Sequence, residues 1–172
     1  MTVLVIGSSS KLVQKLSFPE DIYVVSHKNI PLEGHFTSIY IFSYSLVHEE
    51  NVALLDKVSY LQCSSINLIS SITSSIDPKY LYTYPNIKRK SEDHAKKLNF
   101  NIIKIGMILE TLNSIPKSGI FITTNIDILK KIILGDNSLV INLDKKDFWS
   151  AGYGATFQYF YTYLLIKLGK YS

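Results

Sequence analysis

Short runs of apolar, often β-branched residues recur along the chain, and most are followed by polar turns. They predict strands at residues 3–6, 22–25, 39–42, 66–69 and 102–105, and a last strand at 139–143. The runs at 3–6 and 22–25 are continuously apolar, which is typical of strands buried on both faces.

Between these runs, apolar residues recur at the spacing of an α-helix. Helices are expected at residues 11–16, 51–61, 84–98 and 124–134, with inward side chains in the first two at Leu12, Val13, Leu16, Val52, Leu55, Val58 and Leu61. Strands that alternate with helices predict an α/β fold, with a parallel sheet and helices on both faces. We find no linker or repeat, so residues 1–172 are expected to form a single domain.

A separate apolar stripe lies near the end of the chain, at residues 155–168. Its large side chains, among them Phe157, Phe160 and Leu164, recur at helical spacing. The polar face of this helix carries too few charges for a membrane-surface helix. We therefore expect a core or subunit-interface helix, and a homo-oligomer that assembles through it.

Composition limits the classes of protein that fit this sequence. The chain is 47% hydrophobic and 19% charged, which suits a packed core and not a disordered chain. A net charge of +4 suits an anionic small molecule, but the basic residues are scattered, so no nucleic-acid partner is expected. No apolar run reaches the ~18 residues of a membrane span, and the N-terminus has the pattern of a strand and not of a signal peptide.

The cysteine and histidine content indicates the compartment and argues against a metal. Cys63 is the single cysteine of the chain, which excludes an internal disulfide and fits a reducing, cytoplasmic location. The four histidines form no close ligand pair, so no metal site is expected.

Candidate chemistry centres on Tyr84 and Lys88, which share one face of a predicted helical turn. A phenol normally loses its proton near pH ~10. A cation beside it favours the phenolate and lowers its pKa. The pair can then work as an acid/base near neutral pH, although its spacing alone is common.

Two further features stand in an order that fits one chemistry. Gly7 opens the turn after the first strand, where a doubly wound sheet holds the pyrophosphate of a dinucleotide. Ser71 lies at the end of the fourth strand, 13 residues before Tyr84. Ligands of such sheets bind outside the carboxyl ends of the strands, so these residues are expected to share a site.

With these features, the sequence resembles the short-chain dehydrogenase/reductase superfamily, and most closely its nucleotide-sugar epimerase, dehydratase and reductase branch. Tyr84-Pro-Asn-Ile-Lys88-Arg-Lys-Ser-Glu92 is similar to that branch's Tyr-x-x-Ser-Lys-x-x-Ala-Glu helix. Residues 67–71 resemble its serine-bearing strand end, and residues 103–111 its strand ending in Pro-Gly, with Ile105 at the proline position. The resemblance covers roughly residues 1–112.

The resemblance implies a Rossmann-like fold and an NAD(P)-dependent oxidoreductase or epimerase-like enzyme that acts on a sugar or nucleotide-sugar. Tyr84 would be the acid/base for a substrate hydroxyl or carbonyl. Lys88 would lower the pKa of Tyr84 and hold the nicotinamide ribose. Ser71, or Thr73 as its alternate, would hydrogen-bond the substrate oxygen. The residues that would hold the cofactor are Gly7, Ser9, Ser10, Lys11, His27, Lys28 and Gly106.

The sequence also departs from the family pattern. Ser10 and Val13 replace the second and third glycines of the turn, which reduces the physical roles of those glycines. The second strand is followed by His27 and Lys28 and no acidic residue, which favours NADP over NAD. Residues 113–172 are short for a substrate region and are expected to be a reduced substrate or interface region. The alternative is a non-catalytic Rossmann-like protein, with a binding, regulatory or assembly role, that has lost cofactor binding.

Overall fold

The computed structural model of the protein describes residues 2–71, 74, 83–105, 107–109, 120–134 and 148–150. Its centre is a five-stranded sheet in the order β2-β1-β3-β4-β5, and all of its strand pairs are parallel. The strands are β1 (Val3–Ile6), β2 (Ile22–Val25), β3 (His35–Ile41), β4 (Gln62–Ser71) and β5 (Asn101–Ile105). The predicted Rossmann-like parallel sheet is confirmed.

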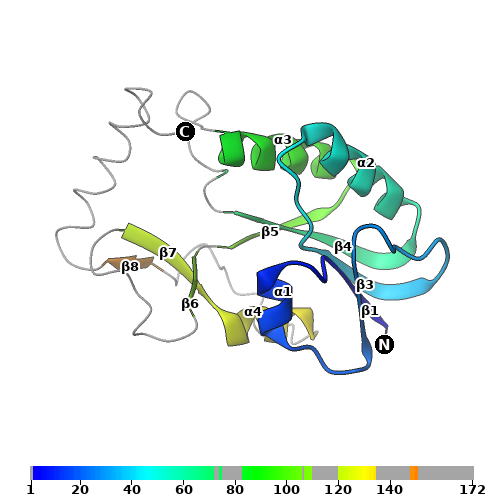
Figure 1. Cartoon of the computed structure of the whole chain (residues 1–172), viewed down its shortest axis with the longest axis horizontal. Coiled ribbons are helices and arrows are strands. Elements are labelled where there is room, and N and C mark those ends of the chain that lie inside the picture. The colour runs from blue at the N-terminus through cyan, green and yellow to red at the C-terminus, as the bar shows by residue number, and fades with distance from the viewer. Residues whose placement is uncertain are drawn as a thin grey trace.

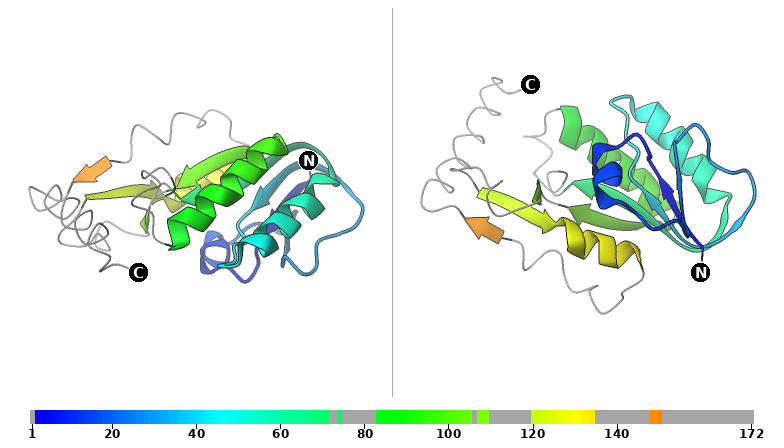
Figure 2. Two further views of the ribbon diagram at one scale, coloured as in Figure 1. Left: turned by 90° about the horizontal axis from the view of Figure 1, so that it is seen from above. Right: turned by 60° about the horizontal axis from the view of Figure 1, so that its bottom comes forward.

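Helices cover both faces of this sheet, as predicted. They are α1 (Lys11–Leu16), α2 (His48–Ser59), α3 (Thr83–Lys97) and α4 (Ile126–Ile133). Figure 1 shows α2 and α3 above the sheet and α1 and α4 below it, and Figure 2 shows the same layers from two other directions. Each pair of helices contributes to its own apolar cluster, so the core consists of two layers divided by the sheet.

Alternation along the strands explains how one sheet supplies both layers. Ile39 and Ile41 of β3 pack in the cluster that contains α2 and α3. Tyr40 and Phe42 point the other way and pack in the cluster of α1 and α4. In β1 every residue is buried, so this strand is covered on both faces as its sequence predicted.

The predicted burial of β2 on both faces is wrong. Its bounds are those expected, but Tyr23 is 62% exposed and Val24 is 37% exposed. Among the described strands, β2 is one of the two edge strands of the sheet and pairs only with β1. Continuous apolar sequence identifies a strand, but it does not reveal the position of that strand in the sheet.

Two strands, β3 and β4, continue through polar residues beyond the apolar runs that predicted them. β3 begins at His35, and β4 runs from Gln62 to Ser71, so both are longer than predicted. Ladder hydrogen bonds use the backbone and need no apolar side chain. Polar side chains also pair across the sheet: the hydroxyls of Ser38 and Ser65 lie 2.9 Å apart.

A smaller sheet follows β5 and was not predicted. It consists of β6 (Met107–Leu109), β7 (Ile120–Asn125) and β8 (Phe148–Ser150), in the order β6-β7-β8. The helix expected at residues 124–134 is α4. The strand expected at 139–143 and the apolar helix expected at 155–168 lie outside the described residues. No helix in the described part of the chain is long and apolar enough to cross a membrane.

Gly7 allows the β1–α1 turn to approach the loop after β3. Its φ is +130°, a region that side chains rarely adopt. A Cβ on Gly7 would lie 3.1 Å from the Cβ of Phe42 and 3.1 Å from the backbone nitrogen of Ser43. The positive φ and these tight contacts both favour glycine here, whether or not a ligand binds.

We predict that Gly7→Ala lowers the free energy of unfolding by about 2 kcal/mol or more, because it combines backbone strain with a steric clash. Urea unfolding followed by circular dichroism measures this loss. Ser9→Ala, in the exposed part of the same turn, is the matched control and is expected to change stability by less than about 0.5 kcal/mol. Equal stabilities for Gly7→Ala and the wild type would contradict the packing role.

Candidate functional site

A pocket of about 230 Å³ opens at the carboxyl ends of four neighbouring strands. From the strand ends, the lining residues are Ser10 after β1, Phe42 and Tyr44 after β3, Ile69, Ser70 and Ser71 at the end of β4, and Ile105 at the end of β5. Leu12 of α1 and Tyr84 and Lys88 of α3 complete the lining. β1 and β3 are neighbours although the chain runs from β1 to β2 first, so the strand order reverses between them. Doubly wound sheets bind ligands at such a reversal.

Helix α3 presents a largely polar face to the protein interior. Its buried residues are Pro85, Lys88, Ser91, Glu92 and Ala95, which recur at helical spacing. Long charged side chains are rarely buried unless they are paired. The buried face of α3 therefore indicates a functional or tightly specified polar site and not simple core packing.

Lys88 is the buried cation of this face. Its side chain lines the pocket, and the residue is 8% exposed. Burial disfavours the ammonium and lowers the pKa of Lys88 to about 8, while the charge of Glu92 acts in the opposite direction. Near neutral pH the side chain is therefore still mostly an ammonium, but it loses its proton at a lower pH than an exposed lysine does.

Tyr44 is the site residue that the sequence reasoning missed. Its ring centroid lies 4.3 Å from the Nζ of Lys88, whereas the ring of Tyr84 is 5.9 Å from that atom. The two rings meet edge to face, with centroids 5.1 Å apart, and the hydroxyl of Tyr44 donates to the backbone oxygen of Tyr84 at 3.4 Å. Tyr44 therefore lies against both members of the predicted pair and stabilises the ammonium through its π face.

The pKa of Tyr44 is raised to about 12. Burial is the larger cause, and the neighbouring Tyr84 adds to it. The phenol of Tyr44 stays protonated at neutral pH, which makes it a poor base. Its place in the sequence offered one signal: Tyr44 comes just after β3, and the carboxyl ends of parallel strands share one edge of the sheet.

Asn51 holds the loop that carries Tyr44. Its side chain is buried, and its Oδ1 accepts a hydrogen bond from the backbone nitrogen of Ser45 at 2.8 Å. Its Nδ2 donates to the backbone oxygens of Ser45, at 2.8 Å, and Val47, at 3.2 Å. The loop between β3 and α2 is thereby fixed from the first turns of α2.

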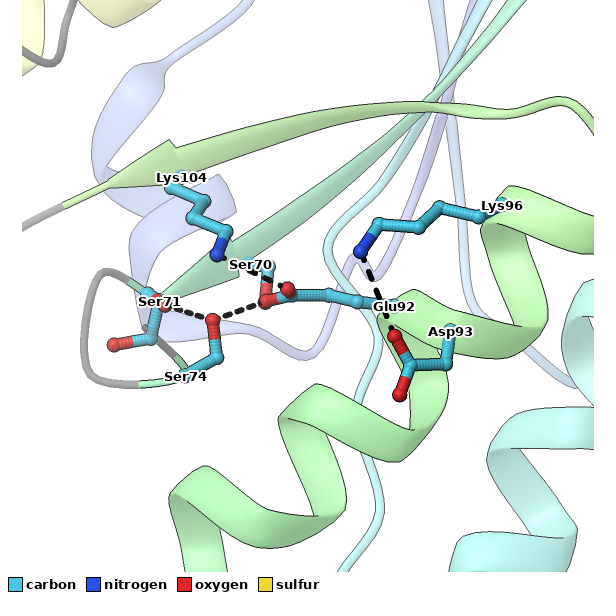
Figure 3. A network of polar contacts seen from close by, with 7 residues as sticks. All are labelled: Ser70, Ser71, Ser74, Glu92, Asp93, Lys96 and Lys104. Atoms are coloured by element: carbon cyan, nitrogen blue, oxygen red, sulfur yellow. Dashed lines mark hydrogen bonds and ion pairs between the residues drawn. The ribbon is translucent and has the colours of Figure 1, made fainter. Parts of the chain in front are cut away.

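Ser71, predicted to bind the substrate oxygen, lines the pocket together with Tyr84 and Lys88. Ser70, directly before it, is buried and donates a hydrogen bond to Glu92 (Figure 3). The structure thus brings three predicted catalytic residues to one cavity. The alternate Thr73 lies outside the described residues.

Only some of the residues predicted to hold the cofactor lie at the pocket. In the turn after β1, the backbone nitrogens of Gly7 and Ser8 donate to the Val25 carbonyl at 2.8 and 3.0 Å, and that of Ser10 donates to Gly7. These three backbone amides therefore already donate hydrogen bonds within the protein. Ser10 lines the pocket, whereas Ser9 and Lys11 are exposed. Val13, at the third glycine position, is buried in the cluster of α1 and α4.

His27 and Lys28 are exposed in the turn after β2, an edge strand. Neither residue lines the pocket that contains Tyr84. Gly106 lies outside the described residues. The NADP preference assigned to His27 and Lys28 therefore stays a prediction.

The buried ammonium of Lys88 makes stability depend on pH. Because its pKa is lower in the folded state, the unfolded chain binds more protons between about pH 8 and pH 10.5, and stability rises with pH across that window. We predict that wild type gains about 3 kcal/mol relative to Lys88→Met as pH rises through the window. Urea unfolding of both proteins at each end of the window measures the gain.

Lys90→Met is the matched control for this measurement, since Lys90 is exposed on the same helix. Its stability relative to wild type is expected to change little with pH. The ionisation of tyrosines in the unfolded chain is common to all three proteins and cancels in the comparison. A constant difference between wild type and Lys88→Met would contradict the burial of a titrating ammonium.

No protein-family model matches the chain, and no curated protein matches its sequence. Solved structures do match its fold. A UDP-glucuronic acid 4-epimerase from Bacillus cereus, solved with UDP-glucuronic acid and NAD, aligns with a TM-score of 0.52 at 12% identity over 86% of this chain and 74% of the epimerase. A short-chain dehydrogenase/reductase from Veillonella parvula aligns with a TM-score of 0.54 at 10% identity, over 77% of this chain and 84% of that protein.

A third match is the capsular polysaccharide assembling protein CapF from Staphylococcus aureus, with a TM-score of 0.53 and 13% identity over 78% of this chain. This chain spans about half of CapF, or 49% of its length. At such low identities the similarity establishes the fold alone. The resemblance found in the sequence is thus confirmed as a shared Rossmann-like fold with nucleotide-sugar epimerases and short-chain dehydrogenase/reductases.

Proposed function

We propose that this protein is an NAD(P)-dependent oxidoreductase or epimerase-like enzyme that acts on a sugar or nucleotide-sugar. The observation that carries the proposal is the shared pocket of Tyr84, Lys88 and Ser71 at the carboxyl ends of the strands. The sequence resemblance implies a catalytic role for each of these residues. Their meeting in one cavity supports a common role.

Tyr84 is the acid/base in this proposal. It lines the pocket and is 36% exposed, so its phenol has access to a ligand. The other phenol of the pocket, Tyr44, has a raised pKa of about 12 and stays protonated. Lys88 favours the phenolate of Tyr84 while its ammonium is charged, and Ser71 donates a hydrogen bond to the oxygen that Tyr84 protonates or deprotonates.

The pocket suits the reacting end of a dinucleotide. Ser10 and Leu12, at the start of α1, form one side of it, and Tyr84 and Lys88 form another. Its volume is slightly below the ~300–1,000 Å³ of typical ligand pockets, so the described residues enclose only part of a cofactor and sugar. Bound nicotinamide would supply hydride transfer, and Lys88 would hold its ribose.

The structural matches support a sugar or nucleotide-sugar as the substrate class. The epimerase from Bacillus cereus was solved with UDP-glucuronic acid and NAD. The net charge of +4 of this chain is compatible with a substrate that carries phosphates. We propose a sugar or nucleotide-sugar for the pocket, and the cytoplasm as the location. Assembly into a homo-oligomer through residues 155–168 is part of the same proposal.

The contact between Tyr44 and Lys88 favours a second candidate function. With the ring 4.3 Å from the ammonium, the cation that would hold a ribose is already engaged by the protein. The turn after β1 has also lost two glycines, and α1 has only six residues. Under the second candidate the chain is a non-catalytic Rossmann-like protein with a binding, regulatory or assembly role.

For the enzyme we predict that Tyr84→Phe lowers kcat/KM for a UDP-sugar by roughly 10²-fold or more, because it removes the proton that is transferred. Cofactor affinity, measured from nicotinamide fluorescence during NADH and NADPH titrations, is expected to stay unchanged. Tyr60→Phe is the control, because it alters a phenol that is 86% exposed and does not line the pocket. Absence of any binding by the wild type at millimolar NADH and NADPH would overturn the enzyme proposal.

The variant Tyr44→Ala separates the two candidates. If the Tyr44 ring blocks the cofactor, the wild type gives no fluorescence signal with NADH or NADPH, and the variant gains one. If the enzyme proposal is right, the wild type binds, and the variant binds no more tightly because it has lost a wall of the site. Circular dichroism of both proteins verifies that the loop substitution leaves the fold intact.

A further inference from the structure

The carboxylate of Glu92 joins three parts of the site (Figure 3). The residue lies on α3 and is 2% exposed. Its Oε1 accepts hydrogen bonds from the hydroxyls of Ser70, at 2.5 Å, and Ser74. Its Oε2 pairs with the Nζ of Lys104 on β5 at 3.2 Å. One buried charge thus connects α3 to the end of β4, to the segment beyond it and to β5.

These contacts fix the backbone on both sides of Ser71. Ser70 precedes Ser71 in β4 and is bound to Glu92 through its side chain. On the other side, the hydroxyl of Ser74 also lies 2.7 Å from the carbonyl oxygen of Ser71. Because the same carboxylate holds a residue before Ser71 and a residue after it, movement of the β4 end requires that buried hydrogen bonds break.

The same carboxylate acts on Lys88. Glu92 follows Lys88 by one helical turn, and both lie on the buried face of α3. Its negative charge favours the ammonium and opposes the effect of burial. The other groups around this ammonium are the phenols of Tyr44, from the loop after β3, and Tyr84, from α3 itself. From β5, Lys104 offsets part of the charge of Glu92.

We propose that Glu92 is the positioning residue of this pocket: it fixes the backbone of Ser71, and it supplies a negative charge one helical turn from Lys88 on the same buried helix face. Glu92 does not line the pocket, so it acts through these two residues and not on a ligand. The catalytic meaning of the coupling rests on the proposed function. The coupling itself is a property of the polypeptide and is measurable without cofactor or substrate.

The electrostatic half is tested by NMR titration of protein labelled with ¹³C at the lysine ε-carbons, with the Lys88 signal assigned from Lys88→Met. Glu92→Gln removes the charge and keeps the shape, and it is expected to lower the pKa of Lys88 by about one pH unit. Asp93→Asn removes the next carboxylate along the helix, which is exposed and lies 3.5 Å from Lys96. It is expected to leave the pKa of Lys88 unchanged. No shift in Glu92→Gln, or an equal shift in both variants, overturns the electrostatic role.

The structural half is tested by hydrogen exchange at the end of β4. Ser74→Ala removes a hydroxyl that contacts Glu92 but keeps every charge. Exchange of the backbone amides near Ser71 is expected to become about tenfold faster, as for the loss of one hydrogen bond, while the titration of Lys88 stays as in wild type. Ser64→Ala, in an exposed position of the same strand, is the control. Unchanged exchange in Ser74→Ala overturns the structural role.

A second variant, which keeps the negative charge, tests the proposal even if Glu92→Gln does not fold. Glu92→Asp withdraws the carboxylate from the hydroxyls, so it is expected to speed exchange near Ser71 and to leave Lys88 charged over much of its wild-type pH range. A wild-type exchange rate in Glu92→Asp contradicts the proposal. Absence of nicotinamide binding overturns the enzyme proposal and leaves these results intact, so the two failures are distinguishable.

Discussion

The burial of charge on α3 is the constraint on which the site depends. Lys88 and Glu92 lie one turn apart on the inward face of this helix, and a buried charge without partners destabilises a fold by several kcal/mol. Glu92 meets that constraint with two serine hydroxyls and the ammonium of Lys104. Lys88 meets it with the face of Tyr44, the distant charge of Glu92 and a lowered pKa of about 8. The partners come from four different segments, so the helix fixes the relative positions of the strand ends around the pocket.

The doubly wound sheet makes this arrangement possible. Parallel strands bring their carboxyl ends to one edge, and the reversal of strand order between β1 and β3 leaves room there for a pocket. The fold is shared with a UDP-glucuronic acid 4-epimerase that was solved with NAD, while the packing of the turn after β1 is particular to this chain. Gly7 is retained for close packing against Phe42, and Val13 is part of the apolar core. The half of the pocket with Tyr84 therefore follows the pattern that the sequence resembles more closely than the half with the glycine turn does.

Much of the fold was predictable, because apolar runs and helical spacing report burial directly. The sequence predicted all five strands of the main sheet and the covering helices on both faces. Its errors have physical causes: β2 is exposed because it is an edge strand, and β3 and β4 are longer because backbone pairing continues through polar residues. Of the pocket residues, Tyr84 and Lys88 were predicted from their four-residue spacing, and Ser71 from its place at the end of a strand. Tyr44 was not, since a loop tyrosine 40 residues away from Tyr84 carries no periodic signal.

The sequence by itself determined the succession of strands and helices as far as β5, the Tyr84–Lys88 pair on one helical face and the presence of Ser10 and Val13 after the first strand. These properties depend on neighbours within a few residues, and local periodicity encodes them. Only the tertiary structure decided which groups share the pocket and how deeply Lys88 is buried. It also decided that Glu92 binds Ser70, Ser74 and Lys104. Those properties depend on contacts between residues far apart in the chain, and the packing of strands and helices creates such contacts.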